Sequence, residues 1–333
     1  MTIRIRSALM ALGASAAVSL SSLGAAPVQA AVELDKPECL APAKPGGGYD
    51  LTCRLAATSL QQTGILKKPM AVNYMPGGIG AVAYNHVIGV RDDDPNLIVA
   101  ASTGAALNLA EGKFGKYDGS EVRWLGAVAT DYGAIVVRED APWQSLDELM
   151  EDLKQNPGKV VFGAGGTVGS QDWMKAALTA KAADIDPRKL RYVAFEGGGE
   201  SLAALLGNHI QVFTGDLSEI ESQLKGGKVR VLAALSDERQ GGAFADVPTA
   251  KEQGYDVEWP IWRGYYMGGK VSDEAYQTWL DKFTQLVKTD QFKQARQARG
   301  LFPFTKLGPE FDAYVKERIA HFNQLAKEMG LAK

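Results

Sequence analysis

The stretch Ala41-Pro-Ala-Lys-Pro-Gly-Gly-Gly-Tyr-Asp50 lies between a short apolar run and a segment with leucines at helical spacing. This order predicts a strand, a tight turn and the start of a helix. The glycines let the backbone approach a ligand closely, and the free N–H groups of a first helical turn favour a carboxylate or phosphate. Lys44 can add a positive charge. The alternative interpretation is a plain glycine turn in which Asp50 caps the helix.

The rest of the chain alternates strand-like and helical segments, which predicts an α/β architecture with largely parallel sheets. The predicted strands are Met70–Tyr74, Leu97–Ser102, Arg123–Val128, Ala134–Val137, Val160–Ala164, Arg191–Phe195, Gln211–Thr214 and Val229–Leu235. The predicted helices between them are Ala81–Gly89, Leu146–Gln155, Ser170–Ala183 and Glu200–Leu206. Two later helices carry aromatic stripes, one around Trp279 and one that begins at Pro309, and are expected to cover a sheet.

Candidate hinges divide the chain into two domains. The chain would cross once at Asp131–Val137 and return near Asp246–Pro248 or Trp262–Tyr265. These crossings predict a discontinuous first domain, residues 31–130 plus 247–333, and a second domain, residues 131–246. A cleft at such a hinge is a common ligand site.

Glycine-rich turns follow several predicted strands, at the edge where open parallel sheets bind ligands. These turns are Lys44–Asp50, Pro76–Gly80, Ser102–Ala106, Gly163–Gln171 and Glu196–Ser201. The polar candidates for recognising a ligand near them are Tyr49, Ser102, Thr103, Thr167, Ser170, Gln171 and Asp216. Arg263 stands beside Trp262, and it either pairs with a ligand carboxylate or belongs to a structural salt bridge.

The first 30 residues have the pattern of a signal peptide. Arg4 and Arg6 precede an apolar run and a small-residue cleavage site near Ala30, so the mature chain is expected to begin near Ala31. Removing residues 1–30 removes two of the 36 basic residues and none of the 39 acidic ones, which changes the formal charge from −3 to −5. A mildly acidic protein has no general attraction to nucleic acid, so no nucleic-acid partner is expected.

Cys39 and Cys53 are the only cysteines. In an oxidising compartment they can form a disulfide that closes a loop of ~15 residues around the glycine turn. The spacing leaves two interpretations open, because the Cα atoms of a strand residue and a residue one turn into the helix can exceed the ~7 Å limit for a bridge. We favour the disulfide over two buried thiols.

The sequence lacks familiar catalytic and metal-binding patterns. The three histidines are scattered, at His86, His209 and His321. Asp92-Asp93-Asp94 does not have the alternating oxygen ligands of a calcium loop. Gly163–Gly169 supports a competing hypothesis, an exported NAD-type oxidoreductase, but its glycine spacing does not match the dinucleotide fingerprint. We therefore expect no enzyme, no catalytic residues, no cofactor and no metal.

Five motifs occur in a specific order along the chain. They are Pro42-Ala-Lys-Pro-Gly-Gly-Gly-Tyr-Asp50, Asn73-Tyr-Met-Pro-Gly-Gly-Ile-Gly80, Phe195-Glu-Gly-Gly-Gly-Glu-Ser-Leu-Ala-Ala-Leu-Leu-Gly207, Leu224-Lys-Gly-Gly-Lys-Val-Arg-Val-Leu-Ala-Ala234 and Asp246-Val-Pro-Thr249. With them, the chain from about 35 to 330 resembles the substrate-binding proteins of tripartite tricarboxylate transporters, the TctC or Bug family. Two departures from many relatives are Lys44, where they have Pro or an apolar residue, and Thr167–Asp172, where they have a Ser/His-rich turn.

The resemblance implies a periplasmic two-domain binding protein of the type II-like class, a monomer whose domains are mainly parallel sheets flanked by helices. It implies that the cleft closes on a small carboxylate, which is delivered to a permease with one large and one small subunit. The residues implied to hold one carboxylate are Gly46, Gly47, Gly48, Tyr49 and Asp50 with Gly197, Gly198 and Gly199 facing them. The stretch from Cys39 to Cys53 looks like the citrate-type subgroup, which favours a tricarboxylate. A sensor module that closes on the same ligand is the alternative.

Overall fold

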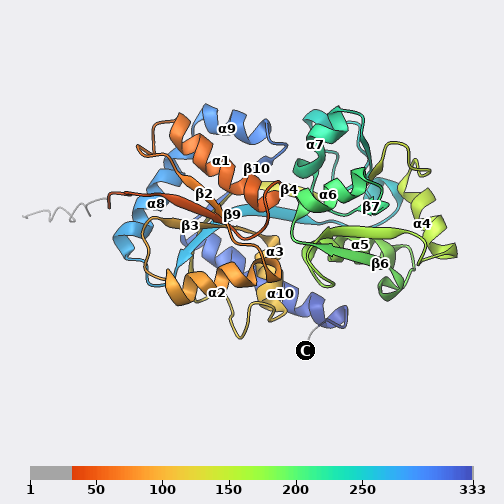
Figure 1. Cartoon of the computed structure of the whole chain (residues 1–333), viewed down its shortest axis with the longest axis horizontal. Helices are drawn as coiled ribbons and strands as arrows, with labels where there is room; N and C mark the ends of the chain where they lie inside the picture. Colours follow the sequence, from red (N-terminus) through yellow and green to blue (C-terminus); the bar gives the residue numbers. More distant parts are fainter. Residues whose placement is uncertain (1–31, 332–333) are drawn as a thin grey trace, which may run out of the picture. The chain divides into compact units, whose positions relative to one another are not determined.

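The computed structural model describes residues 32–331, so the expected signal peptide lies outside the described residues (Figure 1). Within this range, none of the helices combines the length and the apolar character needed to cross a membrane.

The described residues contain one sheet of ten strands. Their bounds are β1 Glu38–Ala41, β2 Ala71–Tyr74, β3 Leu97–Ser102, β4 Val122–Arg138, β5 Val161–Gly165, β6 Arg191–Phe195, β7 Val212–Phe213, β8 Val229–Leu235, β9 Pro260–Gly268 and β10 Phe302–Leu307. The strand order is β2-β1-β3-β9-β4-β7-β5-β6, and β8 and β10 also pair with β4. We call β1, β2, β3, β9 and β10 the first sheet half, and β5 to β8 the second sheet half.

Strand β4 joins the two halves. Its residues up to Tyr132 pair with β9, and its residues from Gly133 onward pair with β8. The two predicted strands Arg123–Val128 and Ala134–Val137 are therefore one continuous strand, and β9 and β10 were not predicted as strands. The expected parallel pairing holds among β1, β2 and β3 and among β5, β6 and β7, whereas every pairing of β4 and β9 is antiparallel. The predicted α/β class is confirmed.

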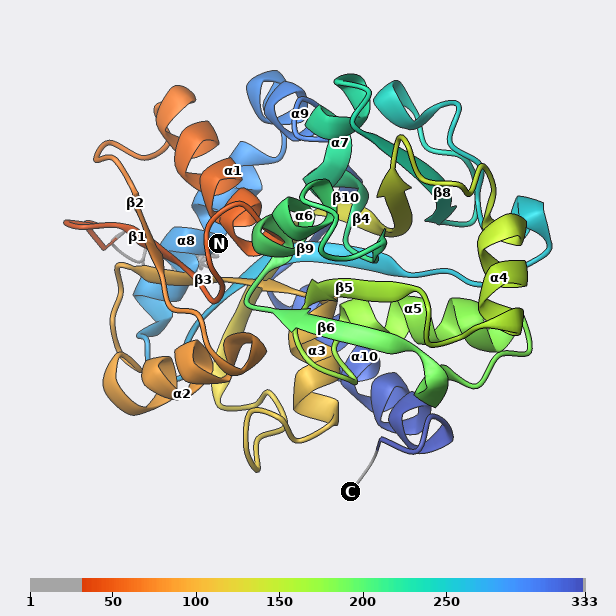
Figure 2. The ribbon, with the colours of Figure 1, turned by 45° about the vertical axis from the view of Figure 1, so that its right-hand side comes forward.

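Ten α-helices of the described chain cover this sheet. They are α1 Gly48–Gln62, α2 Ala81–Val90, α3 Thr103–Ala110, α4 Leu146–Gln155, α5 Gln171–Ala182, α6 Gly198–Leu206, α7 Leu217–Lys225, α8 Asp273–Leu286, α9 Asp290–Gln297 and α10 Pro309–Glu328. On one face α2, α3, α4, α5 and α10 share a single apolar core that runs under both halves. On the other face α1, α8 and α9 cover the first half, and α6 and α7 cover the second with a separate core (Figure 2).

The predicted domain boundary at residues 246 and 247 stays a prediction. Several contacts beyond it still belong to the second sheet half: Thr249 forms a β-bridge with Ala234, and the N–H of Leu146 donates to the side chain of Gln253. The N–H of Trp259 donates to Leu235 O in β8. These contacts favour a boundary close to Trp259, where β9 begins, rather than at residue 246.

Cys39 and Cys53 form a disulfide with a Cα–Cα distance of 5.5 Å. The Cα atoms of the two cysteines do not exceed the limit for a bridge, because α1 packs back over β1 and β3. Cys39 lies two residues before the end of β1, about 7 Å along the strand, and Cys53 lies five residues into α1, about 7.5 Å along the helix. Because the helix runs back along the strand, these two displacements are nearly equal, and the two sulfur atoms lie close enough to bond.

Candidate functional site

A cavity of about 300 Å³ lies where the glycine-rich turns of the two sheet halves meet. Helices α1, α5 and α6 begin at its wall, and α3 and α7 contribute residues from their first two turns or from the position just before the helix. Its lining residues are Pro42, Ala43, Lys44, Gly47, Gly48, Tyr49, Gly78, Ile79, Gly104, Asn108, Gly165, Gly166, Thr167, Gln171, Asp172, Ala194, Phe195, Glu196, Gly197, Gly198, Glu200, Asp216, Glu219 and Arg263. The converging helix starts provide backbone N–H groups that favour a negatively charged ligand group.

The turns after β1 and β6 touch each other directly beside this cavity. The N–H of Lys44 donates to Glu196 O at 3.4 Å. A Cβ on Gly199 would lie only 2.9 Å from Pro45 O, which is closer than side chains approach a backbone oxygen. Glycine is therefore required at Gly199 for the contact between the turns.

Ten of the residues expected from the sequence line the cavity, and six do not. The ten are Lys44, Gly47, Gly48, Tyr49, Thr167, Gln171, Gly197, Gly198, Asp216 and Arg263. The six outside the lining are Gly46, Asp50, Ser102, Thr103, Ser170 and Gly199. Their assignment as ligand-binding residues stays a prediction.

Four of those six have side-chain bonds that hold the turns in place. Asp50 accepts hydrogen bonds from Gly46 N at 2.8 Å and from Arg54 Nε at 2.7 Å. Ser102 caps α3, because its Oγ accepts from Gly104 N, and Ser170 caps α5 by accepting from Trp173 N. The Thr103 hydroxyl donates to Pro260 O and accepts from Trp262 N, which ties α3 to β9.

Arg263 is a buried structural cation as well as a lining residue. Its side chain is 2% exposed, and Nη2 pairs with Asp131 Oδ2 at 2.7 Å and with Asp216. Asp131 belongs to β4 and Asp216 precedes α7, so this guanidinium links β9 to the second sheet half. The structural salt bridge, which was one of the two interpretations of Arg263, is therefore present.

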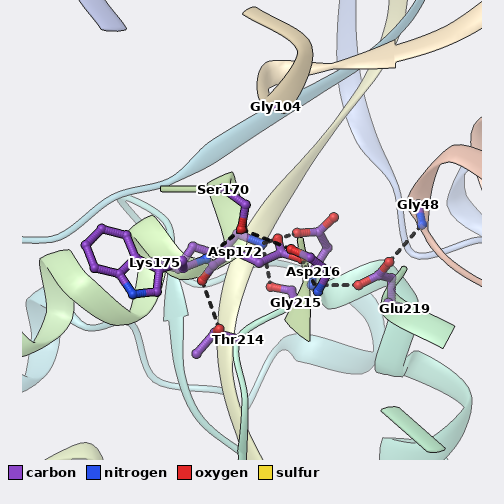
Figure 3. A network of polar contacts seen from close by, with 12 residues as sticks. Gly48, Gly104, Ser170, Asp172, Lys175, Thr214, Gly215, Asp216 and Glu219 are labelled. Carbon is purple, nitrogen blue, oxygen red and sulfur yellow. Dashed lines mark hydrogen bonds and ion pairs between the residues drawn. The ribbon is translucent and has the colours of Figure 1, made fainter. Parts of the chain in front are cut away.

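Lys175 extends this network on the far side of Asp216 (Figure 3). Its side chain is fully buried, and Nζ donates to Asp172 Oδ1 at 2.7 Å, to Gly215 O at 2.9 Å and to Asp216. Burial opposes its charge, but Asp172 and Asp216 outweigh that effect and raise the pKa of Lys175. Lys175 was not expected from the sequence, because a lysine inside an amphipathic helix gives no local sign that it is buried.

Glu219 was also not expected from the sequence, although its carboxylate lies at the start of α1, where a ligand carboxylate was predicted. Its Oε1 accepts from Gly48 N at 2.7 Å and its Oε2 accepts from Asp216 N at 3.1 Å (Figure 3). A carboxylate of the second sheet half thus holds an N–H at the start of α1, where a ligand carboxylate was expected. The spacing of Asp216 and Glu219, an acid at a helix start with Glu three residues later, is the signal that could have identified it.

The carboxylates around the cavity have unequal pKa values. Burial, together with the charges of Asp216 and Asp172, raises the pKa of Glu219 to about 8. Burial also raises the pKa of Asp172 to about 6, against the opposing effect of Lys175. For Asp216, Lys175 and Arg263 outweigh burial and lower the pKa. Glu219 is therefore the carboxylate that holds a proton at neutral pH.

We expect the free energy of unfolding to fall as the pH rises from about 4.5 to about 8. Folded Glu219 keeps its proton until about pH 8, whereas the unfolded side chain releases it near its usual pKa of 4.5. Replacement Glu219→Gln should flatten this dependence, measured by urea unfolding at several pH values in that window. The control is Glu221→Gln on the same helix, whose carboxylate pairs with Lys225 at 2.5 Å. Equal slopes for wild type and Glu219→Gln would contradict the assignment.

No group of three His, Cys, Asp or Glu side chains among the described residues is arranged to hold a metal ion.

Comparisons with known proteins cover most of the chain. The family model described as "Tripartite tricarboxylate transporter family receptor" matches residues 54–331. Protein BugT of Bordetella pertussis is 25% identical over 319 residues, which are 92% of this chain and 93% of BugT. MatC of Rhodopseudomonas palustris, solved with bound malate, has a TM-score of 0.77 at 18% identity over 87% of this chain and 98% of MatC. A second R. palustris protein, solved with adipate, has a TM-score of 0.80 at 18% identity over 89% of this chain and 98% of that one. At these identities the two structures show the likeness of the fold.

Proposed function

The chain belongs to the tripartite tricarboxylate transporter receptor family, and on that basis we propose that it is a periplasmic receptor that binds a small organic acid and passes it to a membrane permease. The protein does not alter this ligand chemically. Its two sheet halves act as lobes that close on the ligand, with β4 and the start of β9 as the hinge. Closure increases the ligand's contacts, so the ligand shifts the population toward the closed form.

One observation carries this proposal: helix starts from both sheet halves meet around a single cavity of about 300 Å³. The start of α1 comes from the first half, and the starts of α5 and α6 come from the second. A ligand in this cavity touches both halves at once. Backbone N–H groups at helix starts stabilise a carboxylate, and α6 begins without a side-chain cap.

A tricarboxylate ligand remains the expectation that the family resemblance supplies. Lys44 lines the cavity and was expected to provide a positive charge for it. The side chain of Lys44 is 47% exposed, however, and it pairs with Glu200 at 3.2 Å. An exposed pair of this kind contributes at most about 1 kcal/mol. A pair between this exposed ammonium group and a ligand carboxylate would contribute as little, so Lys44 alone does not account for the binding of three ligand charges.

We expect at least one small organic acid to stabilise the purified protein in a thermal-shift screen of mono-, di- and tricarboxylates. A ligand at 100 times its Kd adds about 2.7 kcal/mol to the free energy of unfolding. Replacement Thr167→Trp should abolish this shift, because Thr167 is an exposed residue that lines the cavity and an indole would fill the space. The matched control is Val168→Trp, at the neighbouring residue, which is 55% exposed and does not line the cavity.

Two outcomes would reject the proposal: no acid in the panel stabilises the wild type, or incubation converts one of them into a product. Equal loss of ligand binding in Thr167→Trp and Val168→Trp would reject the position of the site. Co-purification with the large and small permease subunits supports delivery, whereas co-purification with a sensor kinase supports the sensor alternative instead.

A further inference from the structure

A second cavity, of about 270 Å³, also lies between the two sheet halves. It shares no lining residue with the cavity described above, which we now call the first cavity. Its walls come from α9 and β10 on the first half, and from α7 and residues 241–244 on the second (Figure 2). Its lining residues are Glu221, Gly241, Gly242, Ala243, Phe244, Arg296, Gln297, Gly300, Leu301, Phe302 and Pro303. This volume is close to the lower end of the ~300–1,000 Å³ that is typical of small-molecule sites.

Arg296 is a cation of this cavity without a carboxylate partner among the described residues. Burial lowers the pKa of Arg296, and no neighbouring carboxylate counters this effect. Its Nε is fully enclosed, whereas Nη1 and Nη2 stay accessible and have no hydrogen-bond partner in the described part of the chain. Glu221 lines the same cavity, but its carboxylate pairs with Lys225 at 2.5 Å. A guanidinium that is taken partly out of water needs an opposite charge or several hydrogen bonds, and an anion in the cavity supplies them.

Two other half-buried arginines show what such a guanidinium has elsewhere in this protein. Arg91 pairs with two carboxylates, and Arg123 pairs with one. Arg296 is half-buried as they are, yet its charge faces a cavity instead of a protein carboxylate. The difference indicates that the partner of Arg296 comes from outside the chain.

Most of the remaining wall is apolar. Phe244 and Leu301 are 1% and 3% exposed, and Phe302 and Pro303 extend the same surface. The ring centroids of Phe244, from the second half, and Phe302, from the first, lie 6.3 Å apart. An inorganic anion would leave this surface in contact with water. A ligand with an apolar body covers it while its charge meets Arg296.

We propose that the second cavity binds a small carboxylate with an apolar body, such as an aromatic monocarboxylate. Its carboxylate accepts hydrogen bonds from Nη1 and Nη2 of Arg296, because a guanidinium matches a carboxylate in this forked geometry. Its body lies against Phe244 and Phe302. Since the walls come from both halves, the occupant stabilises the arrangement of the halves that also forms the first cavity. This last step rests on the proposed closure of the lobes, whereas the site itself does not.

The test is calorimetric titration of the Thr167→Trp variant, in which the first cavity is filled, with probes that separate charge from apolar body. Benzoate carries both, benzyl alcohol lacks the charge, benzylamine reverses it, and acetate and sulfate lack the body. Benzoate should bind at least about 10-fold more tightly than each of the other four, which is the size of one charged hydrogen bond. Equal binding of benzyl alcohol, or tighter binding of sulfate, would overturn the proposed ligand class.

Two pairs of variants in the same background locate the probe. Arg296→Met should weaken benzoate about 10-fold. Arg299→Met should not, because Arg299 donates to Ala295 O and does not line the cavity. Ala243→Trp fills the cavity and should abolish binding, whereas Ala245→Trp, at an exposed residue outside the lining, should keep it. Arg296→Met should also leave the urea midpoint without probe unchanged or higher, since this guanidinium pairs with no described carboxylate.

Hydrogen exchange tests the link to the first cavity. The amides of Lys44 and Gly48 bond across the two halves, to Glu196 O and to Glu219 Oε1. Benzoate should slow the exchange of both amides in Thr167→Trp, and should not do so when Arg296→Met is added. Unchanged exchange in Thr167→Trp would overturn this link.

Failure of benzoate to bind Thr167→Trp would overturn the second site. Equal losses within either pair of variants would overturn it as well, because the probe would then lie elsewhere. The receptor function would stand in both cases, since the thermal-shift screen of the wild type tests it separately.

Discussion

Replacing Arg263 by methionine is expected to lower the free energy of unfolding by about 3–5 kcal/mol. The replacement leaves the carboxylates of Asp131 and Asp216 buried beside each other, with exposures of 0% and 3%. Burial already raises the pKa of Asp131, and Arg263 opposes this rise. Without the guanidinium, one carboxylate must take up a proton or the network must open. Urea unfolding near neutral pH measures the loss.

The control for this experiment is Arg123→Met on strand β4. Arg123 pairs with Asp273 at 2.9 Å, but its side chain is 26% exposed and its partner is 83% exposed. Such a pair contributes about 1 kcal/mol or less. A double variant, Arg263→Met with Asp131→Asn, should recover part of the loss, because it removes one of the stranded charges. Native stability of Arg263→Met with lost ligand binding would show instead that Arg263 serves the ligand alone.

Removing the disulfide with the double replacement Cys39→Ser and Cys53→Ser is expected to lower the free energy of unfolding by about 3 kcal/mol. The bridge joins residues 14 apart in sequence, and both cysteines are fully buried in one core, Cys39 in β1 and Cys53 in α1. Its loss enlarges the unfolded ensemble and places two hydroxyl groups in an apolar environment. The start of α1 should also loosen, because the bridge holds this helix to β1.

Unfolding with and without dithiothreitol provides the matched comparison. The reductant should destabilise the wild type by a similar amount and leave the double variant unchanged. Hydrogen exchange of the amides from Gly47 to Cys53 should increase more than exchange in α10, which is remote from the bridge. Unchanged stability of the double variant would contradict a structural role for this disulfide.

Local patterns predicted most of the fold. The strands β3, β6 and β8 have the bounds expected from their apolar runs, and α4 begins and ends as its amphipathic spacing indicates. Strands β9 and β10 were missed, because aromatic residues and Pro303 hide their alternation. The length of β4 was missed as well, because Asp131 is charged and resembles the end of an apolar strand. Only its ion pair with Arg263 allows this charged residue to continue a buried strand.

The sequence by itself determined the α/β class, the family resemblance, the glycine turns and two cysteines that can form a bridge. These features depend on residues close together in the chain, or on an order of motifs, so they can be read without knowing which segments meet. Only the tertiary structure decided that Glu219 holds the N–H of Gly48, that Arg263 is already paired, and that Arg296 has no carboxylate partner among the described residues. Such facts depend on burial and on partners up to 171 residues away in sequence. The electrostatic environment of a buried group is a sum over all neighbours in space, and local spacing does not contain that sum.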